Sequence, residues 1–194
     1  MPKKIILIIG APGSGKTTDG SKLAEKHAGS ITSYSVGEML KEEIAKGTML
    51  GKINNDYVSV GELVPTAIVI DKMVTAIQEA PTDIILIDGF PRKAKQMKVF
   101  SDLMEADKNM ELLSVIEIRV SEEVARQRVL GREDKREDDE EEVFNNRMRI
   151  YKETIEEIER FYEGRGLLTV IDGERPVEEV VADIDAHLTK QVAL

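Results

Sequence analysis

The stretch KIILIIGAPGSGKTT, residues 4–18, carries the strongest structural signal in this sequence. Its unbroken apolar run at 5–9 is typical of a parallel strand buried on both faces. The glycines that follow let the backbone curl until several N–H groups point at one phosphate, and Lys16 adds a mobile cation where a helix begins. A strand before the motif and a helix after it distinguish a phosphate-binding loop from a plain glycine-rich turn. We therefore predict that this loop binds a phosphate.

Composition limits what else the chain can be. It has 194 residues, a formal net charge of -10 and no cysteine. This length fits one α/β domain with small insertions. The acidic balance argues against a protein that wraps duplex nucleic acid, and the lack of cysteine excludes disulfides and thiolate zinc sites. The apolar run at 5–9 is too short for a signal peptide or a membrane span, so we expect a cytoplasmic enzyme.

Short apolar runs alternate with amphipathic segments along the chain. The predicted strands are 5–9, 30–34, 84–88, 114–119 and 167–171. The predicted helices are 14–27, 37–45, 65–80, 93–106, 122–130, 140–163 and 177–189. In the helix at 140–163, apolar residues at three- and four-residue spacing indicate a face that packs on the core. The alternation predicts a three-layer α/β fold with a mainly parallel five-stranded sheet, helices on both faces and ligands at the carboxyl ends of the strands.

Two segments interrupt this alternation. Residues 35–64 are more than one crossover helix requires, which predicts a small helical insertion. A much shorter interruption at 131–138 predicts a short lid. Insertions at the carboxyl ends of strands commonly cover substrates, so we expect one domain, 1–194, with two flaps.

A second chemical signal is the sequence IDGFPR, residues 87–92. Its strand delivers Asp88 at the carboxyl end, where a carboxylate can organise a magnesium ion or its waters. Gly89 and Pro91 form a rigid turn that can present the Arg92 guanidinium to a second ligand. Beside the phosphate-binding loop, this pattern predicts a site for two ligands.

A third signal is the spacing of arginines. Arg128 and Arg132 are one helical turn apart, Arg136 follows in the loop, and Arg147 lies on the next helix. Pairing with nearby acidic side chains is the alternative for any one of them. As a set beside a phosphate-binding loop they favour phosphoryl transfer, because guanidinium groups stabilise the charge on the oxygens of that transition state.

Together these motifs resemble the nucleoside monophosphate kinases, and most closely the adenylate kinases of the short-lid type, over nearly the whole chain. The motifs that carry the resemblance are GKTT at 15–18, SVGEMLK at 35–41, LVP at 63–65, DGFPR at 88–92 with Gln96, GR at 131–132, REDD at 136–139 and Arg147. The resemblance implies a P-loop fold and a reversible, magnesium-dependent transfer of a phosphoryl group from ATP to AMP that gives two ADP. The expected partners are ATP, AMP and ADP, bound by a monomer without zinc, nucleic acid or membrane.

The resemblance also implies roles for the matching residues. ATP would be held by Gly13, Ser14, Gly15, Lys16, Thr17, Thr18, Arg132, Gly173 and Arg175. AMP would be held by Val36, Lys41, Leu63, Val64, Gly89, Arg92, Gln96, Arg136 and Arg147. The implied catalytic residues are Lys16, Arg92, Arg128, Arg132, Arg136 and Arg147. Magnesium would lie near Thr17 and Asp88, directly or through water.

Three residues depart from the family pattern. Thr17 replaces a glycine and restores the hydroxyl that P-loop proteins in general place on magnesium. Val36 replaces a threonine at the monophosphate base. Lys41 replaces an arginine at the monophosphate phosphate, and because lysine lacks the planar fork we expect weaker AMP binding rather than a different reaction. Gln96 favours adenine, since a carboxamide can pair with both a ring acceptor and an exocyclic amine.

Three alternative functions remain open on the sequence alone. The first is a uridylate or cytidylate kinase, because these related enzymes have an asparagine at the position of Gln96. A regulatory module that binds one nucleotide without transferring anything would need the loop but not Arg92, Gln96 and the lid arginines together. A shikimate-kinase-like enzyme would also carry the GKTT sequence, but it would not account for residues 88–92 followed by Gln96.

Overall fold

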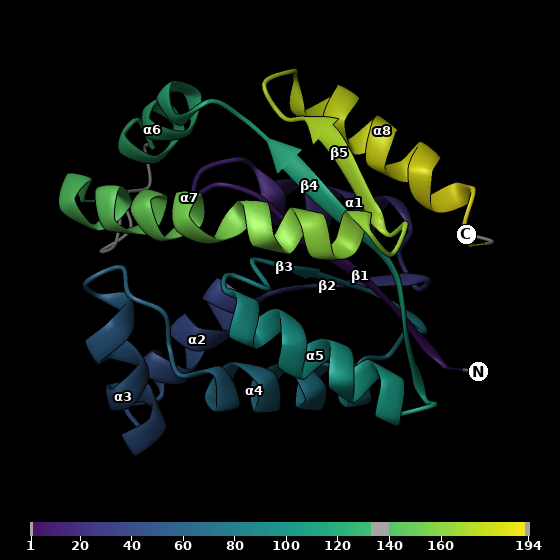
Figure 1. The fold of residues 1–194 in the computed structure, drawn as a ribbon, viewed down its shortest axis with the longest axis horizontal. Helices are drawn as coiled ribbons and strands as arrows, with labels where there is room; N and C mark the ends of the chain where they lie inside the picture. Colours follow the sequence, from purple (N-terminus) through teal and green to yellow (C-terminus); the bar gives the residue numbers. More distant parts are fainter. Residues whose placement is uncertain (1, 133–139, 193–194) are drawn as a thin grey trace.

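The sheet of the protein is parallel throughout, as the alternation predicts. The computed structural model describes residues 2–132 and 140–192 (Figure 1). Its strands are β1 (Lys3–Ile9), β2 (Ile31–Ser35), β3 (Ile84–Asp88), β4 (Met110–Arg119) and β5 (Leu168–Asp172). They form one five-stranded sheet in the order β2-β3-β1-β4-β5, with every neighbouring pair parallel. The predicted α/β fold class is confirmed.

Helices cover both faces of this sheet. In the described part of the chain they are α1 (Lys16–Lys26), α2 (Val36–Ala45), α3 (Met49–Val58), α4 (Thr66–Glu79), α5 (Ala94–Ala106), α6 (Glu122–Leu130), α7 (Glu141–Glu163) and α8 (Val177–Thr189). Figure 1 shows α2 and α3 at one end of the molecule and α8 toward the other. Both helices of that end fall within the predicted insertion at 35–64.

The central strand β1 is buried on both of its faces. Ile5, Leu7 and Ile9 point into a core cluster with residues of α4, α5 and α7, whereas Ile6 and Ile8 point into a second cluster with residues of α1 and α8. This division follows from the strand geometry, in which successive side chains leave opposite faces. The unbroken apolar run thus holds β1 in the middle of the sheet.

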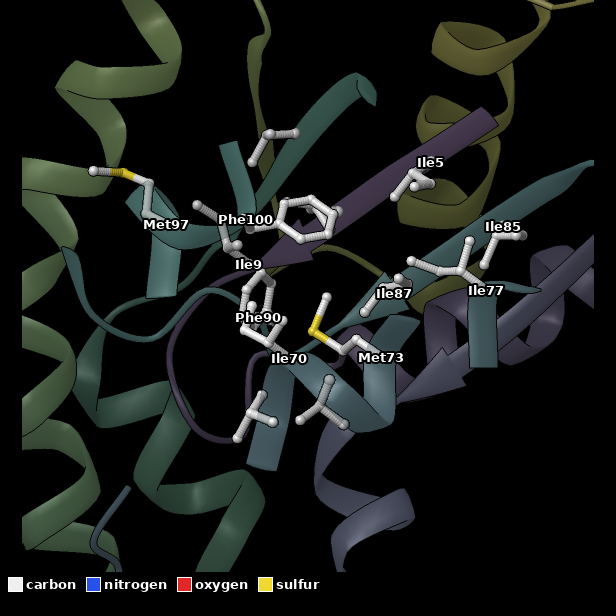
Figure 2. Packing of buried hydrophobic residues seen from close by; sticks show 14 of the residues in the cluster. Ile5, Ile9, Ile70, Met73, Ile77, Ile85, Ile87, Phe90, Met97 and Phe100 are labelled. Carbon is white, nitrogen blue, oxygen red and sulfur yellow. The ribbon is translucent and has the colours of Figure 1, made fainter. Parts of the chain in front are cut away.

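The larger cluster is packed around two phenylalanines and a methionine. Phe90 and Phe100 meet edge to face, with ring centroids 5.2 Å apart, and Met73 is fully buried beside them (Figure 2). Phe90 belongs to the turn after β3, so the same packing that forms the core also fixes the turn that carries Arg92.

Some element bounds differ from the expected ones. Helix α1 begins at Lys16 rather than at position 14, because Gly15 has a φ of 105°, a left-handed conformation outside the helical range. Strand β4 begins at Met110, four positions before the expected start at 114, since the half-exposed stretch with Glu111 hides the apolar signal. Helix α3 was expected only as part of an insertion; Thr48 caps it by accepting a hydrogen bond from the Gly51 N–H at 3.0 Å.

No helix among the described residues is both long enough and apolar enough to span a membrane.

The core of the larger cluster can be tested by truncation. We expect Met73→Ala to lower the free energy of unfolding by roughly 2–5 kcal/mol, because it removes a fully buried side chain and leaves a cavity. The control is Val99→Ala on the exposed side of α5, whose effect should stay within about 0.5 kcal/mol. Chemical denaturation of both variants measures the difference, and similar values for the two would contradict this packing.

Candidate active site

The carboxyl ends of three strands meet where the chain reverses its order across the sheet. Strand β1 lies between β3 and β4, so its end faces the crevice that such a reversal opens. Asp88 at the end of β3 is in register with Ile8 of β1 and with Ser35 of β2. The phosphate-binding loop, which begins directly after β1, therefore lies beside Asp88.

Glycine is required in the loop by close approach of the backbone. A Cβ on Gly10 would lie 2.4 Å from the carbonyl oxygen of Ile118, and one on Gly13 would lie 2.6 Å from that of Ala125. Both residues also have positive φ, 146° and 81°. The loop is thereby packed tightly against the end of β4 and against α6.

The ammonium of Lys16 is held by the loop itself. Its Nζ donates to the carbonyl oxygens of Gly10 at 3.0 Å and Ala11 at 2.7 Å, and to Ser14 Oγ at 3.0 Å. Burial lowers the pKa of Lys16 to about 8, an effect that the nearby Asp88 opposes and Arg92 reinforces. The loop therefore holds a desolvated cation that an anionic ligand would stabilise in its charged form.

Asp88 is a buried carboxylate, with 3 % of its surface exposed. Its Oδ1 accepts hydrogen bonds from Thr17 Oγ1 and Ser35 Oγ, both at 3.3 Å. Its Oδ2 is buried and has no hydrogen-bond partner among the described residues. Burial raises the pKa of Asp88, against the opposing effect of Lys16. A buried carboxylate oxygen without a hydrogen-bond partner can bind a cation or accept a hydrogen bond from a water bound to the cation.

Asp19 is a second buried acid that the sequence reasoning missed. It lies in the first turn of α1, only 2 % exposed, and its Oδ2 would be 3.2 Å from a Cβ on Gly15. Burial raises its pKa to about 6, while Arg128 and Lys16 oppose the rise. Arg128 in turn donates to the Ser14 carbonyl at 3.3 Å. An acid in the first helical turn is common, so its position gave no signal of a loop contact.

One pocket joins the loop, α2, the segment after α3, the turn after β3, and α7. The predicted site residues that line it are Gly13, Lys16, Thr17, Val36, Lys41, Leu63, Val64, Asp88, Gly89, Arg92, Gln96, Arg132 and Arg147. The structure thus brings together residues that are more than a hundred positions apart in the chain. A loop for phosphates, a buried carboxylate and several cations in one pocket can hold and screen two anionic ligands.

Arg92 and Gln96 form one unit at this pocket. The backbone N–H of Arg92 donates to Gln96 Oε1 at 2.8 Å, and Arg92 Nε donates to the carbonyl of Gly89 at 2.7 Å. Gln96 is buried, with 3 % of its surface exposed, whereas Arg92 is exposed. The amide of Gln96 therefore braces the turn that carries the guanidinium.

The remaining predicted residues lie elsewhere. Ser14, Gly15, Thr18 and Arg128 belong to the loop, to α1 or to α6 but are not part of the pocket wall. Arg175 pairs with Asp183 and Asp172, and the N–H of Gly173 donates to the Arg119 carbonyl at 2.8 Å; neither lines the pocket. Arg136 and positions 133–138 of the expected lid lie outside the described residues.

Helix α7 contributes pocket residues that were expected only in the core. Phe144, Tyr151, Ile155 and Ile158 all line the pocket, and Thr154 joins them. The apolar periodicity correctly predicted the buried face of α7. Periodicity alone cannot show whether such a face contacts only the core or also lines a pocket. Thr154, a polar residue between apolar positions, was the available signal.

Comparison with known proteins agrees on one family. The family model described as adenylate kinase matches residues 8–167. The chain is 52% identical to an adenylate kinase from Sulfurovum sp. (strain NBC37-1), over 98% of this chain and 100% of that protein. It is 47% identical to an adenylate kinase from Nautilia profundicola, over 99% and 100%, and 50% identical to one from Campylobacter lari, over 94% and 95%.

The charges around Lys16 predict two opposite shifts in its titration. NMR of the labelled side chain should give Lys16 a pKa of about 8 rather than the ordinary 10.5. Asp88→Asn should lower this pKa further, because it removes a negative charge that favours the ammonium, whereas Arg92→Gln should raise it. Shifts of the same sign in the two variants, or titration near the ordinary value, would contradict the described site.

Proposed function

The chain belongs to the adenylate kinase family, and on that premise we propose which residues serve the reversible transfer of a phosphoryl group from ATP to AMP that gives two ADP. The observation that carries the proposal is the single pocket that contains both the phosphate-binding loop and the unit of Arg92 and Gln96. Neither a uridylate or cytidylate kinase, a shikimate-kinase-like enzyme, nor a module with one nucleotide accounts for this pocket together with the full-length matches to adenylate kinases.

ATP is assigned to the loop side of the pocket. The residues proposed for its phosphates are Gly13, Ser14, Gly15, Lys16, Thr17 and Thr18, with Arg132 beside them. The glycine-rich backbone, the start of α1 and the Lys16 ammonium support this assignment, because each favours a bound anion. Gly173 and Arg175 are proposed for ATP on the resemblance alone, since they lie outside the pocket wall.

AMP is assigned to the opposite walls. The residues proposed for it are Val36, Lys41, Leu63, Val64, Gly89, Arg92, Gln96, Arg136 and Arg147. All of these except Arg136, which lies outside the described residues, line the pocket. Cationic side chains supply the phosphate contacts, and the Gln96 carboxamide is the proposed reader of the base.

Magnesium fits beside Thr17 and Asp88. The hydroxyl of Thr17 and Oδ2 of Asp88, an atom without a hydrogen-bond partner in the described part of the chain, are hard oxygen ligands at the loop, which is the donor set that this ion prefers. When bound with ATP, the ion screens the negative charge of the phosphates. Ser35 holds Asp88 through its other oxygen and so keeps the free oxygen in place.

Transfer requires placement and charge stabilisation rather than a covalent intermediate with the protein. An oxygen of the AMP phosphate attacks the γ-phosphorus in line, and the ADP leaving group departs on the far side. Lys16, Arg92, Arg128, Arg132, Arg136 and Arg147 are the proposed groups that stabilise the transferring phosphoryl. Segments 35–64 and 131–138 are the proposed flaps that exclude water, since water in the closed site would hydrolyse ATP.

We propose that the enzyme is a cytoplasmic monomer whose partners are ATP, AMP and ADP. The net charge of -10 supports a protein that does not bind nucleic acid, and the lack of cysteine supports a lid without structural zinc.

Gln96 can be tested as the reader of the base. Gln96→Ala should reduce kcat/KM for AMP by roughly 1–3 kcal/mol of transition-state binding, with a much smaller loss for CMP and UMP. Gln96→Glu is the matched variant, because it keeps an acceptor for the Arg92 N–H but removes the amide donors. Steady-state rates with AMP, CMP, UMP and GMP measure both effects. If the glutamate variant keeps the full preference for AMP, then Gln96 only braces the turn.

Lys41 can be tested as a contact of the AMP phosphate. Lys41→Arg should lower KM for AMP and leave KM for ATP unchanged, because a guanidinium can donate two parallel hydrogen bonds to a phosphate whereas the lysine ammonium acts as a single charge. Lys52→Arg on the exposed side of α3 is the control and should change neither constant. An equal change in both constants for Lys41→Arg would remove this residue from the monophosphate site.

A further inference from the structure

The segment at 60–62, between α3 and α4, is hydrogen-bonded to the side of α7. Asn146 Nδ2 donates to the carbonyl oxygen of Val60 at 2.8 Å and to Glu62 Oε1 at 3.2 Å. Arg149 Nη2 donates to Asn146 Oδ1 at 2.8 Å and lies 3.6 Å from the same carboxylate oxygen of Glu62. Both ends of the Asn146 amide are therefore used in holding this segment, and Asn146 itself does not line the pocket.

Gly61 brings the backbone of the segment into contact with the helix. Its φ is 74°, and a Cβ on it would lie 2.9 Å from the carbonyl oxygen of Val143 and 3.3 Å from Arg147 Cγ. A side chain at this position would need both a rare conformation and a shift of the helix or of the segment. The close approach is thus built into the chain and matches the hydrogen bonds of Asn146.

The segment itself reaches the pocket, because Gly61 and Glu62 line it. Leu63 and Val64 follow the segment directly and line the pocket, and Arg147, which follows Asn146 on α7, also lines it. About two helical turns further along α7, Thr154 Oγ1 lies 3.0 Å from the carbonyl oxygen of Arg92. One helix therefore contacts both of the walls that carry the proposed AMP residues.

We propose that Asn146 is a positioning residue for monophosphate binding. Its amide ties the segment at 60–62 to α7 and so sets the distance from Leu63 and Val64 to Arg147 and to the Arg92 turn. Asn146 does not itself line the pocket, and its amide acts through the backbone of Val60. The inference rests on the proposed assignment of AMP to these walls.

The test replaces the donor while keeping the size of the side chain. Asn146→Asp removes both hydrogen-bond donors and places a carboxylate against Glu62, so KM for AMP should rise roughly 2- to 10-fold. KM for ATP and kcat should stay unchanged, which separates a local effect on the monophosphate walls from a general loss of folding. Asn145→Asp is the matched control, since it adds the same charge one position away, where the native side chain accepts a hydrogen bond from Arg126; it should leave KM for AMP unchanged.

A second variant disturbs the same contact from the other side. Gly61→Ala should weaken AMP binding in calorimetry without weakening ATP binding, because its Cβ pushes the segment away from Val143. An unchanged KM for AMP in Asn146→Asp, or equal losses for both nucleotides with a lower unfolding midpoint, would overturn the proposal. A different result would overturn the proposed assignment of the walls. In that case the wild-type enzyme phosphorylates AMP, and the variants Lys41→Arg, Gln96→Ala and Arg92→Ala all keep the wild-type KM for AMP.

Discussion

Burial of β1 on both faces determines where the neighbouring strands and the site lie. An apolar strand with helices on both sides is stable only in the interior of the sheet. In the observed strand order β1 lies where the order reverses, so the phosphate-binding loop that follows it lies there as well. The neighbouring strand β3 then delivers Asp88 beside the loop, and the turn after it is anchored by Phe90 in the core. Packing of the interior and placement of the site are therefore one arrangement.

The site concentrates positive charge within an acidic protein. The protein is acidic overall, yet Lys16, Arg92, Arg132 and Arg147 line a single pocket. Two acids, Asp88 and Asp19, are buried among these cations, and burial raises the pKa of each. The arrangement keeps cations and carboxylates in place before any phosphate arrives, so that little reorganisation is required when charge is transferred.

Much of this arrangement could be predicted from the sequence, because it depends on local patterns. The apolar run at 5–9, the glycines after it and the turn after Asp88 each have a short-range physical signature, and together with the strand–helix alternation they predicted the sheet and part of the pocket wall. Arg136 lies outside the described residues, and the roles of the other matched residues stay predictions.

What could not be predicted depends on long-range packing. Asp19 resembles any acid in a first helical turn, and its burial follows only from the fold around it. The pocket face of α7 continues an apolar stripe without a break in period, so Tyr151 and Ile155 could not be separated from core positions. The contact of Asn146 with Val60 joins residues 86 positions apart, and neither local sequence contains a pattern that predicts it. Gly173 and Arg175 were carried over from a resemblance, and the structure places their backbone and side-chain contacts near β4 and α8.

In the proposed function one pocket holds two nucleotides and transfers a phosphoryl group between them without water. Phosphorus NMR of the protein with ATP, AMP and magnesium tests this most directly. We expect both nucleotides to be consumed together, with the α- and β-phosphorus signals of ADP as the only new ones. The appearance of inorganic phosphate, with AMP left unchanged, would contradict it.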